Sequence, residues 1–137
     1  MIALEIPVWQ FVRIMVQLEG QKGGKSKTVA QLYDDWLSTW KPLDKELAAL
    51  ADENFAAYSD LMMENQVNVT LRDSGQQKAV CATIERVVQL ITKKLDRERQ
   101  NSDSDPEIRK GLDFEISELQ LLLGELQIMK HQAHSQK

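Results

Sequence analysis

The sequence of 137 residues contains one cysteine, Cys81, and two histidines. A single cysteine excludes an internal disulfide framework, which favours a reducing compartment, so we expect the protein to be cytoplasmic. The first seven residues contain no basic stretch, and Glu5 and Pro7 interrupt their apolar run. We therefore expect neither a signal peptide nor a membrane span.

The sequence also has no excess of positive charge, because its formal net charge is −4. Residues 1–50 balance six acids with six bases, and residues 51–137 carry fifteen acids and eleven bases. A nucleic-acid binder usually presents a basic face. The one local candidate is the trio Lys22, Lys25 and Lys27, although lysines in a polar loop are usually just solvated.

Residue types that carry catalysis occur without the partners they need. His131 and His134 are three positions apart, but a zinc site needs a third and a fourth ligand. Cys81 is expected on the buried face of a helix, where a thiol is inert. Asp34 and Asp35 are adjacent, so on a helix they point about 100° apart and cannot share a proton. We predict no catalytic, cofactor-binding or metal-ligating residues, and no enzyme.

The segment 20–28 (GQKGGKSKT) is the only place where glycines, lysines and hydroxyls gather. A phosphate-binding loop, G-x-x-x-x-G-K-[ST], would have its first glycine at position 19, which is Glu19. The variant loop of partitioning ATPases would need a glycine where Ser26 stands. Such a loop also follows a buried strand, which the pattern does not predict here. A P-loop-like nucleotide binder is therefore a remote alternative.

The same segment is better interpreted as a connection between two helices. Glycines commonly end a helix. Thr28, followed three residues later by Gln31, forms a capping box that would start the next helix.

Apolar periodicity predicts helices through most of the chain. The pattern is interrupted at Lys41-Pro42, because a residue before proline is pushed out of the helical region. The segment 67–70 alternates apolar and polar β-branched residues and should be extended. Ser74 with Gln77, and Asp105 before Pro106, are helix-start signals. The expected helices span 8–19, 28–40, 43–65, 74–99 and 105–131.

These elements define an all-α fold, an antiparallel bundle of four to five helices, of which three are long. A short extended segment lies near 67–70. We expect residues 1–137 to form a single helical domain, with a polar linker at 101–105 and a frayed tail at 132–137.

Two groups of apolar residues are candidates for contacts with a partner. Tyr33, Trp36 and Trp40 form an aromatic stripe that could anchor a partner or stack on bases, although helical spacing is more typical of a core. The run 121–123 is three leucines, which spread around more of the helix than one partner face requires. Together with the loop, the candidate DNA or partner contacts are Lys22, Lys25, Lys27, Thr28, Trp36 and Trp40.

Residues 43–95 resemble the middle of phage terminase small subunits. The resemblance rests on Leu43-Asp44 and Tyr58, then on Val67-Asn68-Val69-Thr70 with the turn at Ser74-Gly75. It implies a non-catalytic helical protein that forms rings and recognises viral DNA.

A second resemblance concerns the N-terminal DNA-binding region of plasmid KfrA-like proteins. Pro7, Val12-Arg13, the segment 24–29 (GKSKTV), Tyr33 and Trp36 are similar to that region. This resemblance implies that Lys25, Lys27 and Thr28 begin a recognition helix.

The sequence therefore predicts a non-catalytic helical protein that acts through self-association and through binding of a protein partner. The alternative is a DNA-binding subunit of the small-terminase or KfrA-like type. No cofactor and no contact with a membrane are expected.

Overall fold

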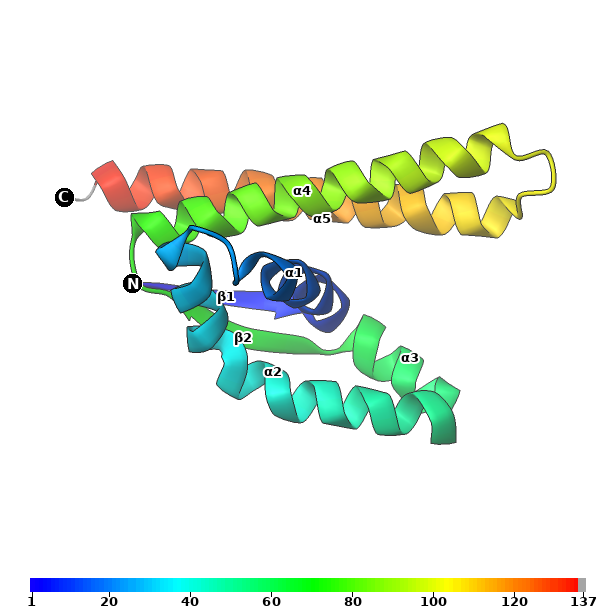
Figure 1. Cartoon of the computed structure of the whole chain (residues 1–137), viewed down its shortest axis with the longest axis horizontal. Helices are drawn as coiled ribbons and strands as arrows, with labels where there is room; N and C mark the ends of the chain where they lie inside the picture. The colour runs from blue at the N-terminus through cyan, green and yellow to red at the C-terminus, as the bar shows by residue number, and fades with distance from the viewer. Residues whose placement is uncertain (136–137) are drawn as a thin grey trace. The chain divides into compact units, whose positions relative to one another are not determined.

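The computed structural model describes the backbone of residues 1–135 and the side chains of residues 1–129. Helices make up 79% of it, so the predicted all-α class is confirmed in its broad sense, with a small two-stranded sheet in addition. The sequence predicts a frayed tail at 132–137. The backbone of 132–135 instead continues the last helix, and 136–137 lie outside the described residues. The elements in chain order (Figure 1) are β1 (Ile2–Pro7), α1 (Val8–Gln21), α2 (Lys27–Glu53), α3 (Phe55–Glu64), β2 (Gln66–Leu71), α4 (Ser74–Gln100) and α5 (Pro106–Ser135).

The chain divides into two compact units, Met1–Ala79 and Val80–Lys137. The first unit contains both strands, helices α1 to α3 and the first residues of α4. The second unit contains the rest of α4 and α5.

The sheet of the first unit pairs the two strands antiparallel, with Leu4 opposite Val69 and Ala3 opposite Thr70. β2 confirms the extended segment that the alternating pattern near 67–70 predicts, whereas β1 is not among the expected elements. Side chains alternate between a buried and an exposed face, as a strand requires. The buried face, on which helices α1 and α2 pack, consists of Leu4, Ile6, Val69 and Leu71.

An aromatic cluster forms the centre of the first unit's core. The ring of Phe11 on α1 lies 5.8 Å from that of Trp36 and 6.0 Å from that of Trp40, both on α2. All three rings are buried. These separations fall in the range that aromatic pairs prefer.

Helix α2 continues through Pro42, so the predicted interruption at Lys41-Pro42 is wrong. A proline inside a helix removes one hydrogen bond and bends the helix, and α2 bends along its course (Figure 1). The helix persists because its apolar row keeps the 3.6-residue period across the proline. That row consists of Trp36, Trp40, Leu43, Leu47 and Leu50, of which Trp36, Trp40 and Leu47 are buried.

The helix expected over 43–65 is instead broken at Asn54. The backbone N–H of Asn54 donates to the carbonyl oxygen of Leu50 (2.9 Å), and this is the last hydrogen bond of α2. Its side-chain oxygen accepts from the backbone N–H of Ala57 (3.1 Å), which begins α3. Asparagine favours such caps because its side chain replaces the missing backbone partner. Phe55, which the pattern places on the inner side, is 72% exposed as a result.

The connection between α1 and α2 confirms the predicted helix–loop–helix arrangement and corrects its details. Ser26, not Thr28, caps α2, since its hydroxyl accepts from the N–H of Val29 (3.2 Å). No glycine among the described residues has a positive φ, so α1 does not end on a left-handed glycine. Instead, the Gly24 amide donates to the carbonyl of Gln21 (3.0 Å), and a Cβ on residue 24 would lie only 3.2 Å from that oxygen.

The sequence predicts a cap for each of the two long C-terminal helices, and the prediction is wrong for α4 and confirmed for α5. Asp73, not Ser74, caps α4, because its carboxylate accepts from the N–H of Gln76 (2.9 Å). Asp105 caps α5 as predicted, accepting from the N–H of Glu107 (2.9 Å).

In the second unit, the polar linker between α4 and α5 reverses the chain, and the two helices run antiparallel (Figure 1). An ion pair between Arg99 and Asp113 (3.6 Å) joins the helices close to the linker. Each helix carries a row of buried apolar residues at intervals of three, four or seven. These rows are Val80, Ile84, Val87, Ile91 and Leu95 on α4, and Leu112, Leu119, Leu122 and Leu126 on α5.

Candidate functional site

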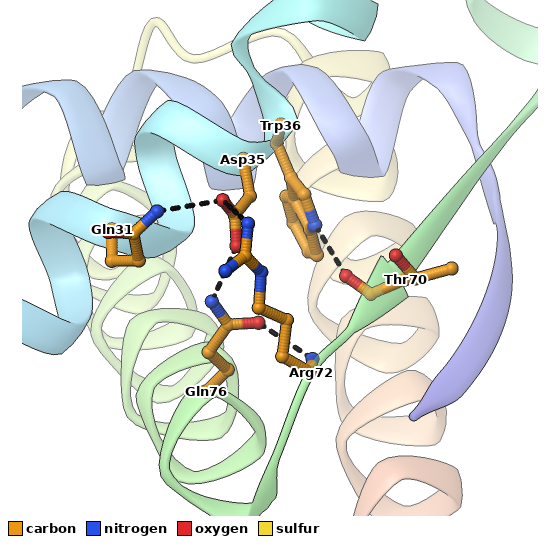
Figure 2. Close-up of polar contacts among 6 residues, drawn as sticks. All are labelled: Gln31, Asp35, Trp36, Thr70, Arg72 and Gln76. Carbon is orange, nitrogen blue, oxygen red and sulfur yellow. Dashed lines mark hydrogen bonds and ion pairs between the residues drawn. The ribbon is translucent and has the colours of Figure 1, made fainter.

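The strongest polar cluster of the first unit surrounds Asp35 on α2 (Figure 2). One carboxylate oxygen accepts from Gln31 Nε2 and from Arg72 Nη2, each at 2.8 Å. The other oxygen accepts from Gln76 Nε2, also at 2.8 Å, and Gln76 Oε1 in turn accepts from the backbone N–H of Arg72 (2.8 Å). The cluster therefore ties α2 to the end of β2 and to the start of α4, all within the first unit.

The environment of Asp35 determines its protonation. Burial acts to raise the pKa of this carboxyl, because its side chain is only 13% exposed. The hydrogen bonds from Gln76 and Gln31 and the charge of Arg72 outweigh burial and lower the pKa below its ordinary value. An ionised carboxylate with both oxygens engaged by donors is suited to holding elements together and not to proton transfer.

The aromatic stripe predicted on α2 belongs to the core of the first unit. The side chains of Trp36 and Trp40 are buried, and Tyr33 is 6% exposed. The Trp36 indole N–H donates to the carbonyl oxygen of Thr70 on β2 (3.0 Å; Figure 2). Neither tryptophan offers a surface on which a base or a partner could stack.

The lysine-bearing loop is exposed from Lys22 to Thr28. The Lys22 ammonium lies 4.4 Å from the centre of the Tyr33 ring, a cation–π contact that fixes it against α2. Lys25, Lys27 and Thr28 lie at the start of α2 with their side chains exposed. The loop follows helix α1 and not the strand that a phosphate-binding loop requires.

Residues suited to metal binding do not gather in the described part of the chain. No three His, Cys, Asp or Glu side chains there are placed to hold an ion. The side chains of His131 and His134 lie outside the described residues. Cys81 is half-buried and not fully buried as the sequence suggests.

The most unusual surface lies on α5, on the side of the helix away from its buried row. Phe114, Leu121 and Ile128 are 46%, 62% and 59% exposed. They are spaced seven residues apart, so they align along one face of the helix. We call this set the apolar stripe. Soluble proteins rarely expose several large apolar side chains together unless the surface binds something.

Sequence reasoning detects only part of this stripe. The run Leu121-Leu122-Leu123 indicates more apolar surface than one partner face needs, and the structure divides it: Leu122 is 9% exposed and Leu121 is 62% exposed. Phe114 and Ile128 are not among the predicted contact residues. The signal that could have identified them is the repeat of seven from Phe114 through Leu121 to Ile128.

Helix α3 carries a second, smaller apolar surface. None of its residues is buried, and Phe55 and Met63 are 72% and 49% exposed. The Phe55 ring stacks on that of Tyr58, with 5.9 Å between centres. These residues do not form an aligned row along the helix, so α3 is the weaker candidate.

Within the described residues, no helix is both long and apolar enough to cross a membrane. Comparison with protein-family models, with curated proteins and with solved structures finds no match for this chain.

Proposed function

We propose that this chain is a non-catalytic protein that acts by associating through helix α5 with another protein chain, beginning with copies of itself. The observation that carries the proposal is the apolar stripe, Phe114, Leu121 and Ile128. Burying a fully exposed side chain of this size contributes about 1.5–3 kcal/mol, and covering the roughly half of each that is still exposed contributes about half as much, so the three together supply part of a binding free energy.

The antiparallel helical bundle expected from the sequence forms, on this proposal, between chains. The hairpin of α4 and α5 contributes two helices, and the associated chain contributes the others. The burial of Leu112, Leu119 and Leu126 on one side of α5 and the exposure of Leu121 on the other support a helix with two apolar faces. A single cysteine and the reducing compartment that it favours support a cytoplasmic location.

A DNA-binding subunit of the small-terminase or KfrA-like type is the second candidate. The observation in its favour is the exposure of basic side chains. They are Lys25 and Lys27 at the start of α2, and Arg86, Lys93, Lys94 and Arg97 on α4. It ranks second because the chain is acidic overall and the two tryptophans that could stack on bases are buried. Nucleotide binding ranks last, because the glycine-containing loop follows a helix.

Light scattering on a sizing column, with and without duplex DNA at two salt concentrations, tests the proposal. We expect a mass above that of one chain, no complex with DNA at low salt, and a lower mass for Leu121→Gln. A wild-type mass of one chain at every concentration would contradict self-association. A DNA complex that disappears with salt and with the combined Lys22→Glu, Lys25→Glu and Lys27→Glu change would favour the second candidate.

A further inference from the structure

The surface of α5 that includes Leu121 and Ile128 also contains two small residues. Ser117 and Gly124 alternate with these two large side chains along the helix, in the order 117, 121, 124 and 128. At about 100° per residue, all four lie within about 60° of one another around the helix axis. Leu121 and Ile128 are 62% and 59% exposed, and Ser117 is exposed as well. We call these four residues the α5 seam.

The α5 seam lies on the side of the helix opposite to its buried row. Leu119 and Leu126 are fully buried, and they lie about 180° around the helix from the centre of the seam. Phe114 has a contact within its own chain and is not part of the seam. The seam therefore stays open while the opposite face of α5 is packed inside the fold.

Gly124 leaves a gap in the middle of the seam. Glycine is unfavourable within a helix compared with alanine. A Cβ added at this position would meet no other described part of the chain within 4 Å, so the packing of the chain itself does not require a glycine there. The missing side chain does allow a second helix to approach the backbone of α5 closely. The small side chain of Ser117 has the same effect seven residues earlier.

The order of large and small residues along the seam is complementary to its own reverse. Read forwards, the seam is small, large, small, large, with steps of four, three and four residues. Read backwards, it is large, small, large, small, with the same steps. Two copies of α5 that run in opposite directions therefore place Leu121 opposite Gly124 and Ile128 opposite Ser117. Helices interdigitate best when large side chains face small ones in this way.

A parallel pair of α5 helices would pack less well. It would place Leu121 opposite Leu121 and Gly124 opposite Gly124, so levels with two large side chains would alternate with levels that have almost none. The small levels would leave voids, whose lining loses its packing contacts. The sizes of the side chains therefore favour an antiparallel pair, and the seam carries its own complement.

The charges beside the seam oppose this pairing only weakly. In an antiparallel pair related by a two-fold axis, each edge of one helix meets the same edge of the other. Glu118 of one copy therefore lies near Glu125 of the other, but interactions between charges that keep contact with solvent are weak. The other edge carries Gln120 and Gln127, whose amides can hydrogen-bond across the pair.

We infer that the occupant of the α5 seam is α5 of a second copy of this chain, docked antiparallel, with Leu121 against Gly124 and Ile128 against Ser117. This inference rests on the proposed function and adds the partner helix, its direction and its register. The pair has two-fold symmetry, so both copies make the same contacts.

Cysteine cross-linking tests the direction and the register. In a Cys81→Ser background, one variant carries Ser117→Cys and another carries Ile128→Cys. The antiparallel pair brings position 117 of one copy beside position 128 of the other. We therefore expect an equimolar mixture under mild oxidation to give a disulfide-linked dimer of the two variants, identified by its mass.

Each variant alone should not cross-link. In the antiparallel pair, the two copies of position 117 are eleven residues apart along the helices, about 16 Å, which is too far for a disulfide, and the same holds for position 128. The matched control is a mixture of Ser117→Cys with Gly111→Cys, because Gly111 is exposed on α5 outside the seam. This mixture should not cross-link either.

Neutralising the acids at the edge of the seam is a second test. Glu118→Gln with Glu125→Gln removes the repulsion between the two copies, and we expect self-association at low salt to strengthen about two- to fivefold. Glu85→Gln, an exposed acid of α4, is the matched control and should associate like the wild type. Weaker association of the double variant would mean that a basic surface faces these acids, and it would overturn the inference.

The results separate this inference from the proposed function. Suppose that Leu121→Gln abolishes association. If Ser117→Cys and Ile128→Cys then each cross-link alone, the helices pair in parallel, and if neither the mixture nor the single variants cross-link, the seam does not meet a second seam. In both cases the inference is wrong and the role of the apolar stripe stands. If the wild type does not self-associate, or if Leu121→Gln associates like the wild type, both the inference and the proposed function fail.

Discussion

Leu121 and Leu122 are consecutive on α5, yet Leu122 is 9% exposed and Leu121 is 62% exposed. The helix turns by about 100° between them, so one belongs to the buried row and the other to the apolar stripe. Two leucines with the same helix propensity thus have different surroundings: one is packed inside the fold, and the other is largely exposed to solvent.

Substitution of these two leucines should separate stability from association. Leu122→Ala removes buried methyl groups and should lower the free energy of unfolding by about 2–4 kcal/mol. Leu121→Gln exchanges an exposed side chain for one of similar helix propensity and should change the stability of the isolated chain by less than about 1 kcal/mol. Urea denaturation at low protein concentration measures both values. Equal losses for the two variants would show that Leu121 is part of the folded core.

The carboxylate of Asp35 should make stability depend on pH. Its pKa is lowered in the folded state, so the stabilisation it gives is complete above the pKa of the unfolded chain and is lost as the pH falls through the lower folded pKa. Asp35→Asn removes the charge opposite Arg72 and places an amide N–H₂ where Gln76 donates. We expect a loss of about 1–2 kcal/mol at pH 7 that shrinks below about pH 4.

Denaturation of wild type and Asp35→Asn across this pH range measures the effect. Asp34→Asn is the matched control, because Asp34 is the exposed neighbour, and it should change stability by less than about 0.5 kcal/mol. A difference between wild type and Asp35→Asn that stays constant with pH would contradict the assigned role of the ionised carboxylate.

Replacement of Pro42 tests how α2 tolerates a proline. Pro42→Ala restores an N–H within the helix at an exposed position, and we expect the free energy of unfolding to rise by about 1–2 kcal/mol. Thermal denaturation measures this change, with Lys41→Ala as the neighbouring control. A lower melting temperature would mean that the bend is needed to pack Trp40 and Leu47.

The parts of the fold that the sequence predicts are those in which a local pattern and burial agree. The helices around Ile84 and Leu119 keep a 3.6-residue period, and Asp105 marks the start of α5. The extended segment near Val69 follows from its alternation.

The errors occur where tertiary contacts decide between two local preferences. Pro42 predicts an interruption, but the apolar row from Trp36 to Leu50 keeps α2 helical across it. The apolar pattern continues on both sides of Asn54, but the chain breaks there because the Asn54 side chain caps the start of α3 and so favours a new helix over continuation of α2. β1 depends on pairing with β2, a strand far away in the sequence, although the alternation of Leu4 and Ile6 with polar or small neighbours was available as a signal.

The apolar stripe was predictable only in part for a similar reason. Three consecutive leucines at 121–123 indicate surplus apolar surface, but only the position of α4 determines which of them is buried. Phe114 and Ile128 can be assigned to the apolar stripe only once it is known which face of α5 is buried.

Sedimentation velocity of the wild type and of Leu121→Gln, across about a hundredfold range of concentration, tests the central claim most directly. Ile108→Gln is the matched control, because Ile108 is an exposed apolar residue of α5 outside the stripe. We predict that the wild type and Ile108→Gln form complexes of more than one chain as the concentration rises, and that Leu121→Gln sediments as a single folded chain throughout. A wild type that sediments as one chain at all concentrations, or a Leu121→Gln variant that associates like the wild type, would contradict the claim.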